Sequence, residues 1–276
     1  NRSVKNGRIT NFDTGVLSTA NVTTELITVI INGCFAEGVT IANGTDVHLD
    51  SLVITNIGGS GVHLTGNNTT FLIRNVLITT SLEGFIFDSI SNSQIQDCIV
   101  ADCSSSALAR GFAILNGSFN QFDNCSVKNL VSTLESRGFF LSNAQNSLLR
   151  DCTAQNIITT LGISAEGFEC ADLSNTIALI RCSALDLEAS SVSAGFELDG
   201  SSIVLNDCLS QSCHATNLNG NGFMCTGTDI TLTNCQAFDC QSTGFIISMC
   251  FHNLTAQRIT LRQILMYGYS LVVRQR

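Results

Sequence analysis

A glycine followed by valine or phenylalanine recurs along most of the chain, and its spacing constrains the fold more than any other feature. The repeated glycines are Gly15, Gly38, Gly61, Gly84, Gly111, Gly138, Gly167, Gly195, Gly222 and Gly244. The first three intervals are 23 residues each, and the later ones lie between 22 and 29. Repeats of this length indicate a solenoid, in which each unit forms one turn and buries its apolar face against its neighbours.

Within each unit, apolar residues recur at fixed positions with the short alternation typical of strands. From Gly38 on, the third residue after each glycine is apolar, and a later position is cysteine in six units, at Cys98, Cys125, Cys152, Cys182, Cys208 and Cys235. Leu52 and Val76 take this place in the shorter early units. Asn or Asp directly precedes most of these cysteines, and both residue types suit tight corners between strands.

Three short strands per unit predict an all-β chain, folded as a single-stranded right-handed parallel β-helix solenoid of about ten coils of 23–29 residues. The absence of Pro agrees, because Pro removes a hydrogen-bond donor from a sheet. We expect the β-helix to cover residues 1–250. Residues 251–276 hold four Arg, both Tyr and no acid, and are predicted to form a C-terminal capping or contact segment.

On these repeat positions the sequence resembles the right-handed parallel β-helix proteins of the pectin-lyase-like superfamily, over about residues 10–250. The resemblance implies the fold. It leaves the function open, because this architecture hosts polysaccharide lyases and hydrolases, phage tailspikes, adhesins and structural fibres. The Asp-Asp, Gly-His-Gly and Arg-x-Lys motifs that mark polygalacturonases of the superfamily are absent from this sequence.

The cysteines are interpreted as core residues. Aligned cysteines on successive coils would have backbones about 4.8 Å apart with parallel side chains, whereas a disulfide needs Cβ atoms about 3.8 Å apart. A reduced ladder is therefore expected. A second series, Cys103, Cys213 and Cys240, follows five residues after three of the ladder cysteines, and only His214 lies near it as a possible further metal ligand, so metal binding is not favoured. The redox state of Cys34 and Cys250 is left open.

The second residue after each glycine is predicted to point outward, because its neighbours point inward. Down the stack this column reads Thr40, His63, Ile86, Ala113, Phe140, Glu169, Glu197, Met224 and Ile246. Ile86, Phe140, Met224 and Ile246 predict a contact stripe, covered either by the inserted segments 104–110 and 132–137 or by a partner.

Glu169 and Glu197 in this column are the candidate catalytic residues, and with Glu166, Asp172 and Asp199 they form a predicted acidic patch. Carboxyl groups about 5–5.5 Å apart suit a retaining glycosidase, and crowding should raise the pKa of one of them. Clustered carboxylates are also compatible with Ca²⁺ binding or with a solvated acidic face. No other cofactor and no metal centre is predicted.

These features favour a non-enzymatic structural or binding protein, a surface, virion or filament component that self-associates or contacts another structural protein. The alternative is a polysaccharide-binding or polysaccharide-cleaving enzyme that uses the acidic patch. The net charge of −9 argues against nucleic-acid binding, and no apolar run approaches the roughly 18 residues of a membrane-spanning helix. The expected location is extracellular, on a cell or virion surface.

Overall fold

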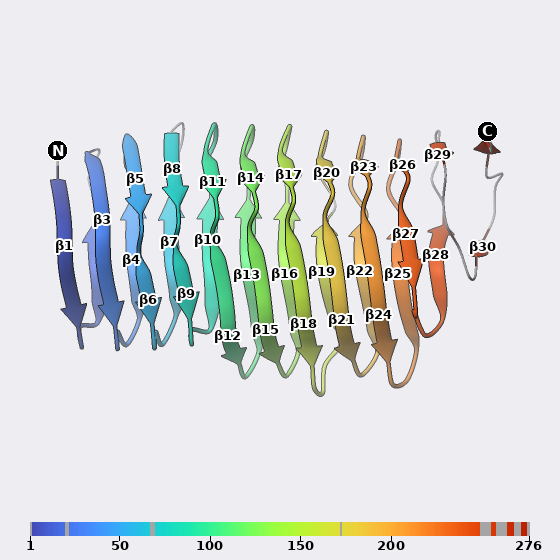
Figure 1. Ribbon diagram of the computed structural model, residues 1–276, viewed down its shortest axis with the longest axis horizontal. Coiled ribbons are helices and arrows are strands. Elements are labelled where there is room, and N and C mark those ends of the chain that lie inside the picture. The colour runs from blue at the N-terminus through green and yellow to red at the C-terminus, as the bar shows by residue number, and fades with distance from the viewer. Residues whose placement is uncertain are drawn as a thin grey trace.

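The computed structural model is a straight stack of coils, with the N-terminus at one end and the C-terminus at the other (Figure 1). It describes residues 2–19, 22–66, 70–171, 173–248, 255–257, 264–267 and 272–274. All of the pairings between its strands are parallel, and they form one 20-stranded and one 11-stranded sheet. The predicted all-β parallel solenoid is confirmed.

The 11-stranded sheet contains the repeated glycines, one strand per coil. Its strands are β2 (Thr14–Ser18), β4 (Glu37–Ala42), β7 (Ser60–Thr65), β10 (Glu83–Asp88), β13 (Leu108–Leu115), β16 (Glu135–Ser142), β19 (Ser164–Cys170), β22 (Val192–Leu198), β25 (Asn219–Cys225), β28 (Thr243–Ser248) and β30 (Ile264–Tyr267).

The 20-stranded sheet bends around the rest of each coil and contains two stacks of strands. The first stack is β5 (Asp46–Asp50), β8 (Thr70–Arg74), β11 (Gln94–Gln96), β14 (Gln121–Asp123), β17 (Leu148–Arg150), β20 (Ala178–Ile180), β23 (Val204–Asn206), β26 (Thr231–Thr233), β29 (Thr255–Gln257) and β31 (Val272–Arg274). The second is β6 (Val53–Thr55), β9 (Leu77–Thr79), β12 (Ile99–Ser105), β15 (Ser126–Ser132), β18 (Thr153–Thr159), β21 (Ser183–Ala189), β24 (Leu209–Ala215) and β27 (Gln236–Phe238). The long strands β1 (Arg2–Thr10) and β3 (Thr23–Asn32) begin this sheet, and β3 pairs with both β5 and β6.

The interior is filled by ladders of identical side chains. Phe85, Phe112, Phe139, Phe168, Phe196, Phe223 and Phe245 stack on successive coils, with ring centroids 4.5–5.0 Å apart. The six aligned cysteines are buried and reduced, as the sequence predicts. Their thiols bond to backbone carbonyls, for example Cys208 Sγ to Leu179 O at 3.4 Å. Cys34 is buried and reduced too, whereas Cys250 lies outside the described residues.

The corners are formed by Asn and Asp in the left-handed conformation that these residues tolerate. Asp97 and Asn124 have φ of 53° and 52°, and the Asn124 amide donates to Asp97 Oδ1 at 2.6 Å on the preceding coil. Asn156 Nδ2 donates in the same way to Asn129 Oδ1 at 2.8 Å. The polar residues that turn the chain therefore also bond one coil to the next.

The inserted residues of the middle units extend each coil at one corner, which projects below the stack in Figure 1. Residues 104–105 continue β12 and 108–110 begin β13, and both pair with the next coil. Segments 104–110 and 132–137 are therefore mostly part of paired strands and do not form loops over the outward stripe, but their last residues, Arg110 and Arg137, lie over the ring of Phe140. The described residues after 250 continue the pairing in β29, β30 and β31. In the described residues no helix is long and apolar enough to cross a membrane.

Candidate functional site

Two outward columns lie side by side on the 11-stranded sheet. The predicted column is confirmed in its register: Phe140 on β16 pairs with Glu169 on β19, and Glu169 pairs with Glu197 on β22. A second column, formed by the residue before each glycine, contains Arg137 paired with Glu166. These five side chains form the acidic face of the sheet.

Arg137 is the cation of the acidic face. Its Nε lies 2.5 Å from Glu169 Oε2 and 3.7 Å from Glu166 Oε2, and one terminal nitrogen lies 2.9 Å from Glu135 Oε2. Both Nε contacts are ion pairs rather than hydrogen bonds, because the contact with Glu166 is too long and the contact with Glu169 falls outside hydrogen-bond geometry. The guanidinium also covers the ring of Phe140, 4.6 Å from its centroid.

The carboxyl groups of this face are withdrawn from solvent. Glu166 is 3 % exposed and Glu169 is 8 % exposed, and Glu197 is half-buried. Burial raises the pKa of Glu169 to about 7, against the opposing effect of Arg137. Burial and repulsion from Asp199 and Glu169 raise the pKa of Glu197 to about 8. The pKa of Glu166 is raised well above its usual range by burial and then by Glu197 and Glu169.

The two remaining members of the predicted patch are placed differently. Asp199 follows the end of β22 and accepts a hydrogen bond from the Thr226 hydroxyl, while its charge raises the pKa of Glu197. Asp172 lies outside the described residues. The charged residues of the candidate site are therefore Arg137 and the three glutamates Glu166, Glu169 and Glu197.

The predicted apolar stripe is less exposed than its outward direction suggested. Ile86 is 6 % exposed, and Phe140, Met224 and Ile246 are half-buried. Phe140 is covered by Arg137 and, at 5.9 Å from its ring centroid, by Arg110. Phe140 is thus covered by arginines of the neighbouring outward column. A contact role for Ile86, Phe140, Met224 and Ile246 stays a prediction.

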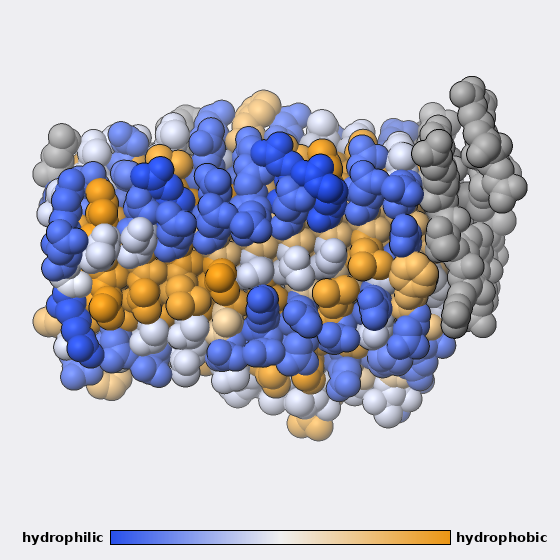
Figure 2. All heavy atoms as spheres, in the orientation of Figure 1, coloured by the Kyte–Doolittle hydropathy of each residue, from blue (hydrophilic) through white to orange (hydrophobic). Residues whose placement is uncertain are grey.

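Another apolar column, which sequence reasoning missed, lies on the opposite side of the coil. Ile30, Val53, Leu77 and Ile99 pair in register, and all except the half-buried Leu77 are exposed. Figure 2 shows a band of apolar side chains over β6 and β9. The sequence did contain a signal for this column: the residue directly after the aligned cysteine position is apolar in the early units, at Val53, Leu77 and Ile99.

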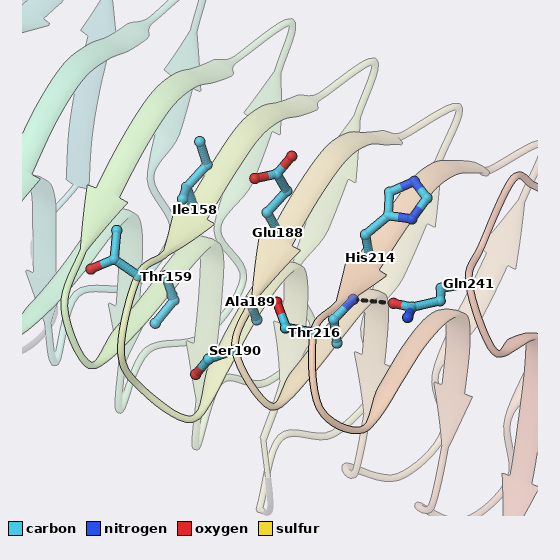
Figure 3. Close-up of a pocket in the computed structure, with 10 residues that line it drawn as sticks. Ile158, Thr159, Glu188, Ala189, Ser190, His214, Thr216 and Gln241 are labelled. Atoms are coloured by element: carbon cyan, nitrogen blue, oxygen red, sulfur yellow. Dashed lines mark hydrogen bonds between the residues drawn. The ribbon is translucent and has the colours of Figure 1, made fainter.

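A cavity of about 610 Å³ lies at the extended corner of the C-terminal half, where the inserted residues project. Glu188 and His214 pair in register on β21 and β24 and line it together with Ser190, Thr216 and Gln241 (Figure 3). The Gln241 side chain accepts a hydrogen bond from Ala215 N at 2.6 Å, which closes one side. Sequence analysis did not single out this cavity, because its residues come together only where the insertions widen the coil.

Chemically, the acidic face can hold protons near neutral pH, and a carboxyl group with a pKa of about 7 suits a general acid. Nothing in the described part of the chain brings three or more His, Cys, Asp or Glu side chains into an arrangement that could hold a metal ion.

The comparisons with known proteins agree with this architecture. Residues 1–133 match the sequence family described as the right handed beta helix region. The N-terminal part of the chain is thus similar to this family, and the parallel solenoid of the structure agrees with that likeness. No curated protein matches it significantly.

Solved structures of two kinds share the fold. The N-terminal fragment of gene product 12 of bacteriophage Phi29 is 12 % identical with a TM-score of 0.62, over 92 % of this chain and 52 % of that one. The catalytic unit of a GH87 α-1,3-glucanase from Streptomyces thermodiastaticus is 9 % identical with a TM-score of 0.59, over 93 % and 52 %. The chain thus spans about half the length of these proteins, and identities this low establish the fold alone.

Proposed function

We propose that this chain is the β-helical rod of a non-enzymatic structural or binding protein, displayed on a virion or cell surface. The observation that carries the proposal is the packing of the candidate catalytic carboxyl groups. Glu169 is almost fully buried and lies against Arg137, which in turn covers Phe140, and Glu197 is half-buried beside them. A glycosidase needs both carboxyl groups open to the sugar, whereas this face is closed by its own side chains.

The interior supports the same proposal. Stacked Phe rings, buried cysteines and bonded Asn and Asp corners repeat from coil to coil, which suits a rigid spacer. The Phi29 gene product is a phage protein of similar fold, and such a rod fits a virion. Contacts with other copies or with another structural protein would bury the exposed column of Ile30, Val53 and Ile99.

One observation favours a second candidate, a polysaccharide-cleaving enzyme. The pKa values of Glu169 and Glu197, about 7 and about 8, lie where a general acid operates. The fold is shared with α-1,3-glucanases. In this alternative Glu169 or Glu197 would protonate the leaving oxygen.

A single pair of measurements separates the two candidates. The chain is incubated with α-1,3-glucan and with a panel of acidic polysaccharides, and the release of reducing ends and of unsaturated products is followed. The proposed rod releases neither, and light scattering on a sizing column reports its state of association. Cleavage that is lost in Glu169→Gln or Glu197→Gln, with folding retained, would overturn the structural proposal.

A further inference from the structure

Cys213 and Cys240 occupy the same repeat position on adjacent coils. Cys213 lies in β24, where it pairs with Leu187 of the preceding coil. Gln241 N donates to Cys213 O at 2.9 Å, which places Cys240 opposite Cys213. Cys240 itself follows β27 and lies outside any strand, between bends at residues 239 and 241–242. Its backbone is therefore less constrained than that of a residue paired within a sheet.

The two thiols lie close enough to shift each other's pKa, and they differ in access to solvent. Cys213 is fully buried and also contacts Ser210 Oγ at 3.2 Å, whereas Cys240 is partly exposed at the edge of the core. A hydrogen bond from the Cys213 thiol lowers the pKa of Cys240, against the effects of burial and of the neighbouring Asp239. The same contact raises the pKa of Cys213. The thiolate of the pair thus forms on the sulfur that a reagent can reach.

The six ladder cysteines lack this access. Cys208 and Cys235, for example, are also stacked on adjacent coils, but both are almost completely buried. Their thiols bond to carbonyls of the preceding coil, such as Cys235 Sγ to Leu205 O at 3.8 Å, as well as to carbonyls of their own coil, which Cys240 Sγ also does with Phe238 O at 3.5 Å. An oxidant can therefore reach Cys240 without opening the core, and it cannot reach the ladder in this way.

We propose that Cys213 and Cys240 are an oxidation site, which closes to a disulfide between successive coils in the presence of a low-molecular-weight disulfide such as oxidised glutathione. The Cys240 thiolate attacks one glutathione sulfur, which breaks the glutathione S–S bond, forms a mixed disulfide and releases one glutathione thiolate. The Cys213 sulfur then attacks Cys240 Sγ, which breaks the mixed disulfide, and the Cys213 proton passes to the departing second glutathione thiolate. Two protein thiols are oxidised and one glutathione disulfide is reduced to two thiols.

The link would tie β24 to the bend between β27 and β28. A covalent link between adjacent coils resists their separation when the stack opens locally. It forms in an oxidising, extracellular setting and stays reduced in a cytosol. The inference does not depend on whether the rod is an enzyme.

The test uses the full chain, purified reduced, freed of reductant and incubated with oxidised glutathione. Free thiols are then alkylated under denaturing conditions and counted, and the disulfides are mapped by mass spectrometry after proteolysis without reduction. We expect the loss of two of the thirteen thiols and a peptide that links Cys213 to Cys240. Cys240→Ser should abolish the loss, and Cys213→Ala should leave Cys240 as a stable mixed disulfide with loss of one thiol. The ladder variant Cys152→Ala is the matched control and should retain the link.

Three outcomes would overturn the inference. The first is no loss of thiols in the folded chain. The second is a glutathione adduct on Cys240 that persists in the unmodified sequence, because Cys213 would then not resolve it. The third is a disulfide that joins Cys240 to another cysteine or that joins two ladder cysteines with equal yield. Circular dichroism of each variant checks that the fold is retained.

Discussion

Arg137 Nε lies 2.5 Å from Glu169 Oε2, across two adjacent strands of the 11-stranded sheet. The same guanidinium lies 3.7 Å from Glu166 Oε2. One cation thus faces two glutamates that are almost fully buried. Such a pair stabilises the fold only as long as both partners are present, because a lone buried charge is costly.

We therefore expect Arg137→Gln to destabilise the chain by about 3 kcal/mol at pH 8, from the uncompensated charge of Glu169. The cost should be smaller at pH 5, where Glu169 is protonated and needs no cation. Urea unfolding at both pH values measures it. Arg110→Gln is the matched control, because Arg110 pairs with the more exposed Glu83 at 2.7 Å, and its loss should cost about 1 kcal/mol or less. Equal costs at pH 5 and pH 8 would contradict this role of Arg137.

The raised pKa values predict how stability depends on pH. The folded pKa values of Glu169 and Glu197, about 7 and about 8, lie above the usual value of 4.5. Between pH 4.5 and 8 the folded chain therefore binds more protons than the unfolded chain, and this contribution to stability is lost as the pH rises. We expect the free energy of unfolding to fall from pH 5 to pH 8, by up to about 3 kcal/mol from Glu169 alone.

The matched control is the double variant Glu169→Gln and Glu197→Gln, whose amides do not titrate. Its urea midpoint should change less over this range and should exceed that of the unmodified chain at pH 8. If the two profiles run parallel from pH 5 to pH 8, these carboxyl groups are not the source of the dependence.

The sequence was enough to predict the register that brings Glu169 and Glu197 together, because a repeat places equivalent residues one above another. The sequence did not predict that Arg137 lies against Glu169 and Glu166. Strict alternation would place the residue before Gly138 inward, since Phe139 points inward two positions later. The strand bends at Gly138, which has no partner in the ladder between Arg137 and Phe139. Arg137 therefore points outward beside Phe140. The sequence analysis did name segments 104–110 and 132–137 as a possible cover of the column, but it did not identify Arg110 and Arg137 as the residues that lie over Phe140.

The stacked side chains of the core predict different stability costs for truncating two residues of the same coil, Phe139 and Cys152. Phe139 is stacked 5.0 Å from Phe112 and 4.8 Å from Phe168, so Phe139→Ala opens a cavity that the rigid stack cannot fill. We expect a loss of about 3–5 kcal/mol in the free energy of unfolding. Cys152→Ala removes one sulfur from a narrow position and should cost about 1 kcal/mol. Chemical denaturation of both variants measures the difference, and a cost for Cys152→Ala that equals the cost for Phe139→Ala would refute a packing role for the cysteine ladder.

The last prediction compares an alanine substitution at a repeated glycine, Gly138, with one at Gly7, which lies outside the repeat motif. A Cβ added at Gly138 would lie 2.5 Å from Gly167 O and 2.7 Å from Ala154 Cβ, so the bend leaves no room for a side chain. Relief requires the coil to move away from its neighbour, and we expect Gly138→Ala to cost about 1–3 kcal/mol in urea unfolding. At Gly7 the nearest atom would be Val4 Cγ1 at 3.6 Å, an ordinary contact, and Gly7→Ala should change stability by less than about 0.5 kcal/mol. If both variants unfold at the same urea concentration, close packing between coils is not what selects glycine at the bend.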